Sequence, residues 1–98
     1  MNGEEWETAY HALDLMSSTG ACADLYWQAW DWVNDGGWVY DFDKGDWGHW
    51  HADSDEIHLW EGTFDFPFEV GVTLFHEAAH RLGMNEEQAE AAALNCVL

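Results

Sequence analysis

Basic residues are almost absent from this sequence of 98 residues. Two Lys and Arg residues face 20 Asp and Glu residues, which gives a formal net charge of −18. Proteins that bind nucleic acid phosphates or anionic membrane surfaces need clustered Lys and Arg side chains, so we predict neither kind of partner. The acidic residues are spread among aromatic residues along the whole chain, a distribution typical of a solvated acidic surface.

Long apolar runs and linkers are also missing. No stretch approaches the roughly 20 apolar residues that span a membrane, and the acidic start MNGEEWETAYHALD has no signal-peptide pattern. We therefore expect a cytoplasmic protein by default, while a module of an exported effector would share these features. With one Pro, no Gly/Ser-rich linker and no internal repeat, the chain predicts a single domain over residues 1–98.

Cysteine is scarce, and Cys22 and Cys96 lie far apart in the sequence. Neither has a second Cys nearby, which argues against a Cys-type zinc site or a redox motif. Both fall in stretches with apolar periodicity, where they would pack as buried thiols. The alternative is a disulfide that ties the two ends of the domain together and stabilises it by roughly 4 kcal/mol.

The order of the apolar patterns predicts an α+β fold. Spacing of three to four residues indicates helices, and strict alternation indicates strands. The predicted helices cover 4–17, 21–33, 68–82 and 86–97, and the predicted strands cover 38–43 and 55–64, with a loop over 44–54. Gly83 suits the C-cap of the third helix and Asn85 the N-cap of the fourth. We expect two N-terminal helices, a small antiparallel sheet, and then two helices that carry the chemistry.

The segment FHEAAHRLGMNEE, residues 75–87, places two histidines one helical turn apart. His76 and His80 project from the same helix face, so two imidazoles can grip one ion. Neutral imidazole suits Zn²⁺, and a catalytic zinc keeps three protein ligands and a water molecule. Glu77, next to this pair, is the candidate general base for that water. The predicted cofactor is therefore Zn²⁺.

The third ligand is predicted on the last helix. At roughly 100° per residue, Glu86 lies along the apolar face of that helix. An unpaired carboxylate is costly there, and a zinc ion would supply its missing partner. Glu87 and Glu90 remain alternatives, because acids at a helix start are also favoured by the helix dipole.

The string HEAAHRLGMNE resembles the zincin metallopeptidase motif. It is similar to the extended His-Glu-x-x-His-x-x-Gly-x-x-His signature of metzincins, with Glu86 in the position of the third His. NEEQAE, residues 85–90, resembles the Asn-Glu-x-x-Ser-Asp motif of thermolysin-like gluzincins. That match places Glu86 on the ligand glutamate and Glu90 on the acid that orients a ligand His.

This resemblance implies a minimal zincin, similar to the minigluzincins and to short metallopeptidase modules of bacterial toxins and phage proteins. Its implied substrate is a peptide or protein. The implied edge strand is 55–60, which would bind an extended peptide by strand addition, with His58 and Trp60 facing substrate or solvent. His49 and His51, in GHWHAD, are read as loop residues or as a second metal site.

Three functions fit these patterns. The first is a zinc-dependent peptidase with Glu77 as its base, and the second is a non-catalytic module that zinc stabilises. The third is an acidic interaction or inhibitor protein without metal. A structural zinc site has no need of Glu77, so its presence favours the peptidase. The sequence favours no particular substrate or oligomeric state.

Overall fold

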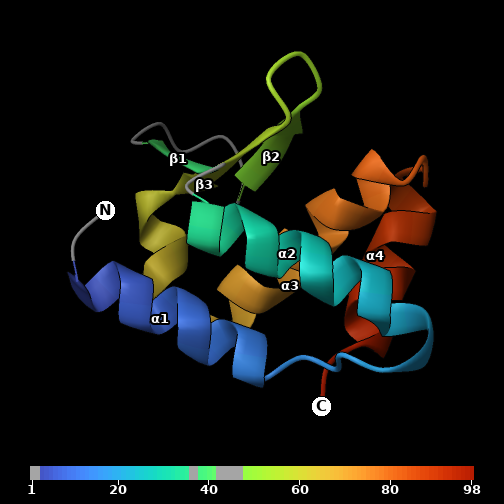
Figure 1. Cartoon of the computed structure of the whole chain (residues 1–98), viewed down its shortest axis with the longest axis horizontal. Coiled ribbons are helices and arrows are strands. Elements are labelled where there is room, and N and C mark those ends of the chain that lie inside the picture. Colours follow the sequence, from blue (N-terminus) through green and yellow to red (C-terminus); the bar gives the residue numbers. More distant parts are fainter. Residues whose placement is uncertain (1–2, 36–37, 42–47) are drawn as a thin grey trace.

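Seven main elements make up the structure, a computed structural model that describes residues 3–35, 38–41 and 48–98 (Figure 1). In chain order they are α1 (Gly3–Asp14), α2 (Ala23–Asp35), β1 (Trp38–Asp41), β2 (Gly48–His51), β3 (Glu56–Trp60), α3 (Pro67–Arg81) and α4 (Glu86–Asn95), with short 3-10 turns at Gly20–Cys22 and Glu61–Asp65. The α+β fold class is confirmed, and all four helices lie where the sequence predicts them. Among the described residues, no helix combines the length and the apolar character needed to cross a membrane.

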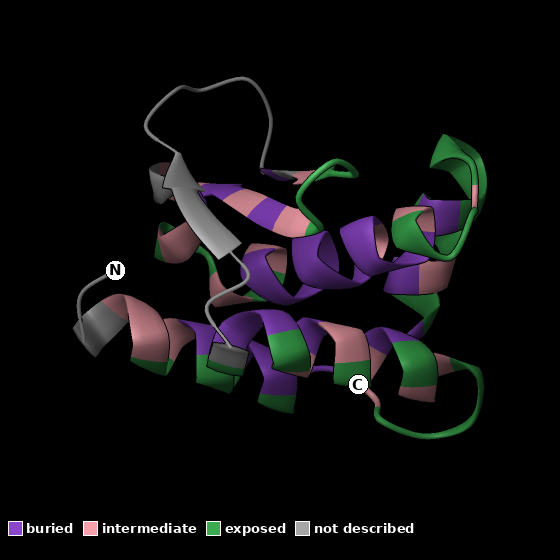
Figure 2. Ribbon diagram, turned by 45° about the horizontal axis from the view of Figure 1, so that its top comes forward, coloured by how far each residue is buried: buried purple, intermediate pink, exposed green. Residues whose placement is uncertain are grey.

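The elements are arranged in layers around α3. Helices α1 and α2 pack on one side of α3, the sheet covers the other side, and α4 lies against its C-terminal half (Figure 1, Figure 2). The run Val70–Phe75 is buried without interruption, as expected for a helix in the centre of a core. Gly71 allows α1 to come close, since a Cβ there would lie 2.9 Å from the carbonyl oxygen of Ala12. The helix that carries the histidines is therefore held from several sides.

The sheet has three strands in the order β1-β3-β2. The two predicted strands do pair, but β1 runs parallel to β3, so the antiparallel pairing expected between them is wrong. The antiparallel partner of β3 is β2, which lies in the predicted loop. Ile57 and Leu59 are fully buried, and His58 and Trp60 are partly exposed, so the alternation predicted for this strand is confirmed. The strand ends at Trp60, because the chain then enters a 3-10 turn instead of continuing to 64.

The predicted loop over 44–54 is wrong in part, because it contains β2. Gly48 has the appearance of a turn residue in the sequence, but its role is packing. A Cβ at this position would lie 2.7 Å from the main-chain oxygen of His58 and 2.8 Å from Cγ2 of Thr73. Glycine inside a strand often marks such a close approach, and here it lets β2 rest on α3.

The prediction that 55–60 is an edge strand is also wrong. β3 is the central strand, and its neighbours pair with it along both sides. Its main-chain groups are therefore already used and cannot add a peptide strand, so His58 and Trp60 do not flank a substrate edge. The edge strand beside the histidine helix is β2, whose Trp50 donates its main-chain N–H to Glu77 of α3.

The turn between α3 and α4 follows the predicted capping signals. Gly83 has φ +95°, its N–H donates to the carbonyl of His80, and the N–H of Met84 donates to that of Ala79, which together form a Schellman motif. Asn85 then caps α4 and forms a reciprocal capping box with Gln88. This tight turn brings the first turn of α4 back beside the end of α3.

The segment between α1 and α2 is tied to the far end of α4. Cys22 and Cys96 form a disulfide across 74 residues, with their Cα atoms 5.7 Å apart. Next to it, Met16 and Val97 form an isolated β-bridge, and the N–H of Ser17 donates to the carbonyl of Cys96. The disulfide alternative of the sequence analysis is therefore confirmed, and α4 is anchored at both of its ends.

Candidate metal centre

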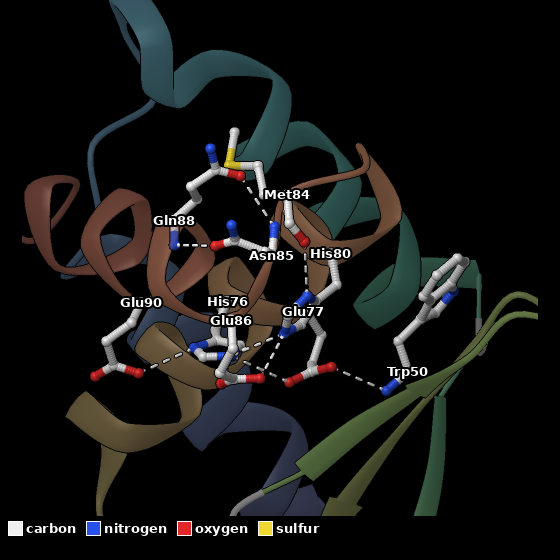
Figure 3. A network of polar contacts seen from close by, with 9 residues as sticks. All are labelled: Trp50, His76, Glu77, His80, Met84, Asn85, Glu86, Gln88 and Glu90. Atoms are coloured by element: carbon white, nitrogen blue, oxygen red, sulfur yellow. Dashed lines mark hydrogen bonds and ion pairs between the residues drawn. The ribbon is translucent and has the colours of Figure 1, made fainter.

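Three potential ligands meet where α3 faces the start of α4 (Figure 3). Nε2 of His76 lies 3.1 Å from Nε2 of His80. The Glu86 carboxylate spans both rings, with Oε1 2.6 Å from Nε2 of His76 and Oε2 3.0 Å from Nε2 of His80. Within the described residues, these three side chains are the group whose ligand atoms all lie within 4.8 Å of one another.

The spacing of this group fits a small divalent cation. Bonds of 2.0–2.1 Å at a tetrahedral angle place neighbouring ligand atoms about 3.3 Å apart. The observed separations of 2.6, 3.0 and 3.1 Å, of which the first two go to different oxygens of Glu86, are shorter by tenths of an ångström, a difference that side-chain rotation can supply. Two imidazoles and one carboxylate are also a known ligand set of catalytic zinc.

The other ring nitrogens show how the imidazoles are oriented. Nδ1 of His80 lies 3.0 Å from the main-chain oxygen of Met84, which can only accept a hydrogen bond. Nδ1 of His76 lies 3.2 Å from Oε2 of Glu90, an acceptor as well when the carboxylate is ionised. Each Nδ1 thus has an acceptor within hydrogen-bond distance, which leaves each Nε2 available to ligate a metal ion at the shared point.

Glu77 lies on the same helix but is held differently. Among the described residues it is the only buried one with a charged side chain, and its Oε1 accepts the main-chain N–H of Trp50 at 3.1 Å. Its Oε2 is 3.9 Å from Nε2 of His76, so this second oxygen faces the ligand group (Figure 3). The sequence places Glu77 beside the histidines, but it gives no sign of the strand that supports it.

Glu86 does lie beside the histidines, but for a different reason from the one that the helical wheel gives. The wheel argument puts Glu86 on a buried face, but its side chain is 77% exposed. The buried face of α4 is made of Ala89, Ala93 and Cys96, and the first turn of the helix extends beyond the core. Glu87 is exposed and stands outside the ligand group.

Asp55 organises a second polar network, which the sequence analysis missed. Its Oδ1 accepts from Nε of Arg81 at 2.8 Å and from Nε1 of Trp50 at 2.9 Å. Its main-chain oxygen accepts from Nε1 of Trp32 at 3.2 Å, and its φ is +53°, a conformation that Asp tolerates better than most residues. The hydrogen bond from Arg81 lowers the pKa of Asp55. Trp50 is thus held at both its indole and its main chain, next to Glu77.

The remaining histidines lie elsewhere. The rings of His51 and His58 stack with centroids 3.9 Å apart, and Nε2 of His58 is 4.0 Å from Oε1 of Glu56. This pair is not part of a three-ligand group among the described residues, and the His49 side chain lies outside them. The ring of Trp60 covers Gly62, leaving no room there for a Cβ.

Comparison of the chain with protein-family models, curated proteins and solved structures gave no match. The likeness to zincins therefore stays a likeness of motif and spacing over the last third of the chain.

Proposed function

We propose that His76, His80 and Glu86 bind zinc and that the protein hydrolyses peptide bonds with Glu77 as general base. One observation carries the proposal. The Nε2 atoms of both imidazoles and the carboxylate of Glu86 converge on one place from two helices. Two imidazole nitrogens and a carboxylate are a ligand set that zinc accepts.

The roles of the protein groups follow from their contacts. Bound zinc supplies Lewis acidity and makes hydroxide available near neutral pH. Glu77 takes the proton of the attacking water with the oxygen that faces the group, while Trp50 holds its other oxygen. Glu90 keeps the His76 ring in place through Nδ1, and the turn carbonyl of Met84 does the same for His80.

A peptide substrate would meet the centre at β2. This strand pairs with β3 along one side only, and its Trp50 N–H already donates to Glu77. Main-chain pairing with an extended peptide would therefore use the remaining main-chain groups of Gly48–His51 in place of the central strand.

A non-catalytic zinc module remains the second candidate, and one contact favours it. Glu77 is buried and already accepts a hydrogen bond from Trp50. It therefore fixes β2 on α3 whether or not it transfers protons, and its presence alone does not require catalysis. The two candidates share the metal and differ in what Glu77 does.

The test measures metal first and hydrolysis second. Metal analysis of the purified protein should find one equivalent of zinc, and iron is measured too, because two His and one carboxylate also serve ferrous iron. Glu86→Gln should lower zinc affinity by more than about 100-fold, and Glu90→Gln by about 10- to 100-fold. Glu87→Gln, a neighbouring exposed carboxylate, is the matched control and should bind zinc as the parent does.

Hydrolysis is then screened on a peptide library with and without zinc. Glu77→Gln keeps an oxygen for the Trp50 N–H, so the fold and the metal should persist while hydrolysis is lost. Zinc binding without any zinc-dependent cleavage would establish the structural module. Failure of the parent protein to bind any divalent metal would overturn both candidates.

A further inference from the structure

A line of aromatic rings crosses the outer side of α1 and α2. Trp6 stacks on Tyr10 with ring centroids 6.0 Å apart. Tyr10 meets Trp30 of α2 edge-on at 5.7 Å, and Trp30 meets Trp27 at 6.4 Å. We call these four residues, Trp6, Tyr10, Trp27 and Trp30, the aromatic ridge.

The exposed part of the ridge is not needed by the core. The buried side of α2 is formed by other residues, namely Leu25, Ala29, Trp32 and Val33. Trp6 and Trp30 pack partly against that core, but Trp27 is 55% exposed and Tyr10 36%. Large aromatic side chains in water are unfavourable and are enriched at binding surfaces. The ridge therefore has the character of a surface that binds a partner.

A hydrogen bond fixes one ring of the ridge across the two helices. The hydroxyl of Tyr10 on α1 donates to Oδ1 of Asn34 on α2 at 2.6 Å. Within α2, Nδ2 of Asn34 donates to the main-chain oxygen of Trp30 at 3.0 Å and so orients the Asn34 amide. A ring that is fixed before binding loses little side-chain entropy when a partner arrives.

Carboxylates flank the most exposed ring. Asp24 and Asp31 stand three residues before and four residues after Trp27 on α2, and all three side chains are exposed. Residues at these spacings are neighbours on a helix surface. Asp31 also lies within electrostatic reach of Arg81, whose guanidinium is already hydrogen-bonded to Asp55. A cation placed on the Trp27 indole would therefore have a carboxylate on either side.

We propose that the aromatic ridge binds a cationic segment of another protein, with an Arg side chain stacked on Trp27 between Asp24 and Asp31. A planar guanidinium stacks on an indole and also donates to carboxylates, which a Lys ammonium does less well. A second copy of this chain fits poorly, because each copy has a net charge of −18. Nucleic acids and anionic lipid surfaces are repelled for the same reason.

This inference is independent of the proposed metal site. The ridge is built from α1 and α2, whereas the ligands come from α3 and α4. A protein with no bound zinc would still present the ridge, and a zinc peptidase could lack a partner for it. The two proposals therefore stand or fall separately.

The experiment has to separate a specific site from general attraction to an acidic protein. The probe is a short fluorescein-labelled peptide of repeated Gly-Ser-Arg units, with a Gly-Ser-Lys peptide for comparison, and anisotropy is measured at physiological ionic strength. Trp27→Ala is compared with Leu94→Ala, which removes an exposed apolar side chain on α4. The double variant Asp24→Asn/Asp31→Asn is compared with Asp53→Asn/Glu87→Asn, which changes net charge equally at exposed sites elsewhere.

We expect Trp27→Ala and Asp24→Asn/Asp31→Asn each to weaken Arg-peptide binding about five- to tenfold, and the two control variants to weaken it less than about twofold. The Arg peptide should bind tighter than the Lys peptide. Equal loss in both double variants would show non-specific charge attraction and overturn the proposal. Unchanged binding in Trp27→Ala, or self-association through the ridge in sedimentation, would overturn it too.

Discussion

Among single residues, Asp55 joins more parts of the fold than any ligand does. Its side chain accepts from Arg81 at the end of α3 and from Trp50 on β2, and its main chain accepts from Trp32 on α2. Because Trp50 in turn donates to Glu77, Asp55 braces the strand that holds the candidate base. The contribution of its charge can be separated from that of its backbone.

The contribution of the Asp55 charge to stability should appear when the unfolding of Asp55→Asn and of the parent protein is compared at different pH values. Arg81 holds the pKa of Asp55 below its ordinary value, so the stabilisation is present above about pH 4 and is lost as pH falls through the lowered pKa. The pair is nearly half exposed, so solvent screening limits the effect to about 1 kcal/mol or less. Asn also tolerates positive φ. Urea unfolding should show a higher free energy of unfolding for the parent near neutral pH and equal values for the two proteins in acid. A difference in this free energy that persists in acid would show that the ion pair is not its cause.

For the secondary-structure elements, local signals could be predicted and contacts distant in sequence could not. His76, His80, Gly83 and Asn85 follow rules of spacing and capping that lie within a few residues of each position. The role of Gly48 depends on Thr73, which is remote in sequence, so the local pattern predicts only a loop there. Strand alternation likewise does not tell which strand is central.

The last helix shows the same limit. The buried stripe of α4 is formed by Ala89, Ala93 and Cys96, but the wheel treats the helix as if its whole length faced the core. The angle set by the α3–α4 turn decides that the first turn of α4 projects past the core toward the imidazoles. Glu86 was therefore brought beside the histidines by the turn and not by an apolar environment.

The Asn85 cap is the part of this turn that can be tested alone. Asn85→Ala leaves the N–H of Gln88 without its acceptor and should lower the free energy of unfolding by about 1 kcal/mol, or Tm by about 5 °C. Asn85→Ser retains a capping oxygen and should cost only a few tenths of a kcal/mol. Because Glu86 is the first residue of α4, zinc affinity should fall for Ala and not for Ser. Equal melting temperatures for Ala and Ser would mean that the cap does not hold the helix.

At the scale of the whole molecule, α4 buries only small side chains of its own against the core. Its own buried side chains are two alanines, and Cys96 follows at its C-cap. The burial of such small groups yields little free energy. The disulfide to Cys22, the bridge of Met16 with Val97 and the turn at Gly83 therefore add to the attachment that packing on α3 provides. The third proposed ligand is thus coupled to a covalent bond at the opposite end of the helix.

Removing that bond should weaken both the fold and the metal site. Cys22→Ala/Cys96→Ala should lower the free energy of unfolding by about 4 kcal/mol, and it introduces no thiol that would itself bind zinc. If α4 then spends part of its time undocked, the apparent zinc affinity falls in proportion to the fraction of molecules in which α4 is docked. Saturating zinc should restore part of the lost stability. Calorimetric zinc titration and melting with and without zinc measure both effects. Unchanged zinc affinity in a destabilised variant would show that the turn alone keeps Glu86 beside the histidines and that the ends of the molecule are not coupled.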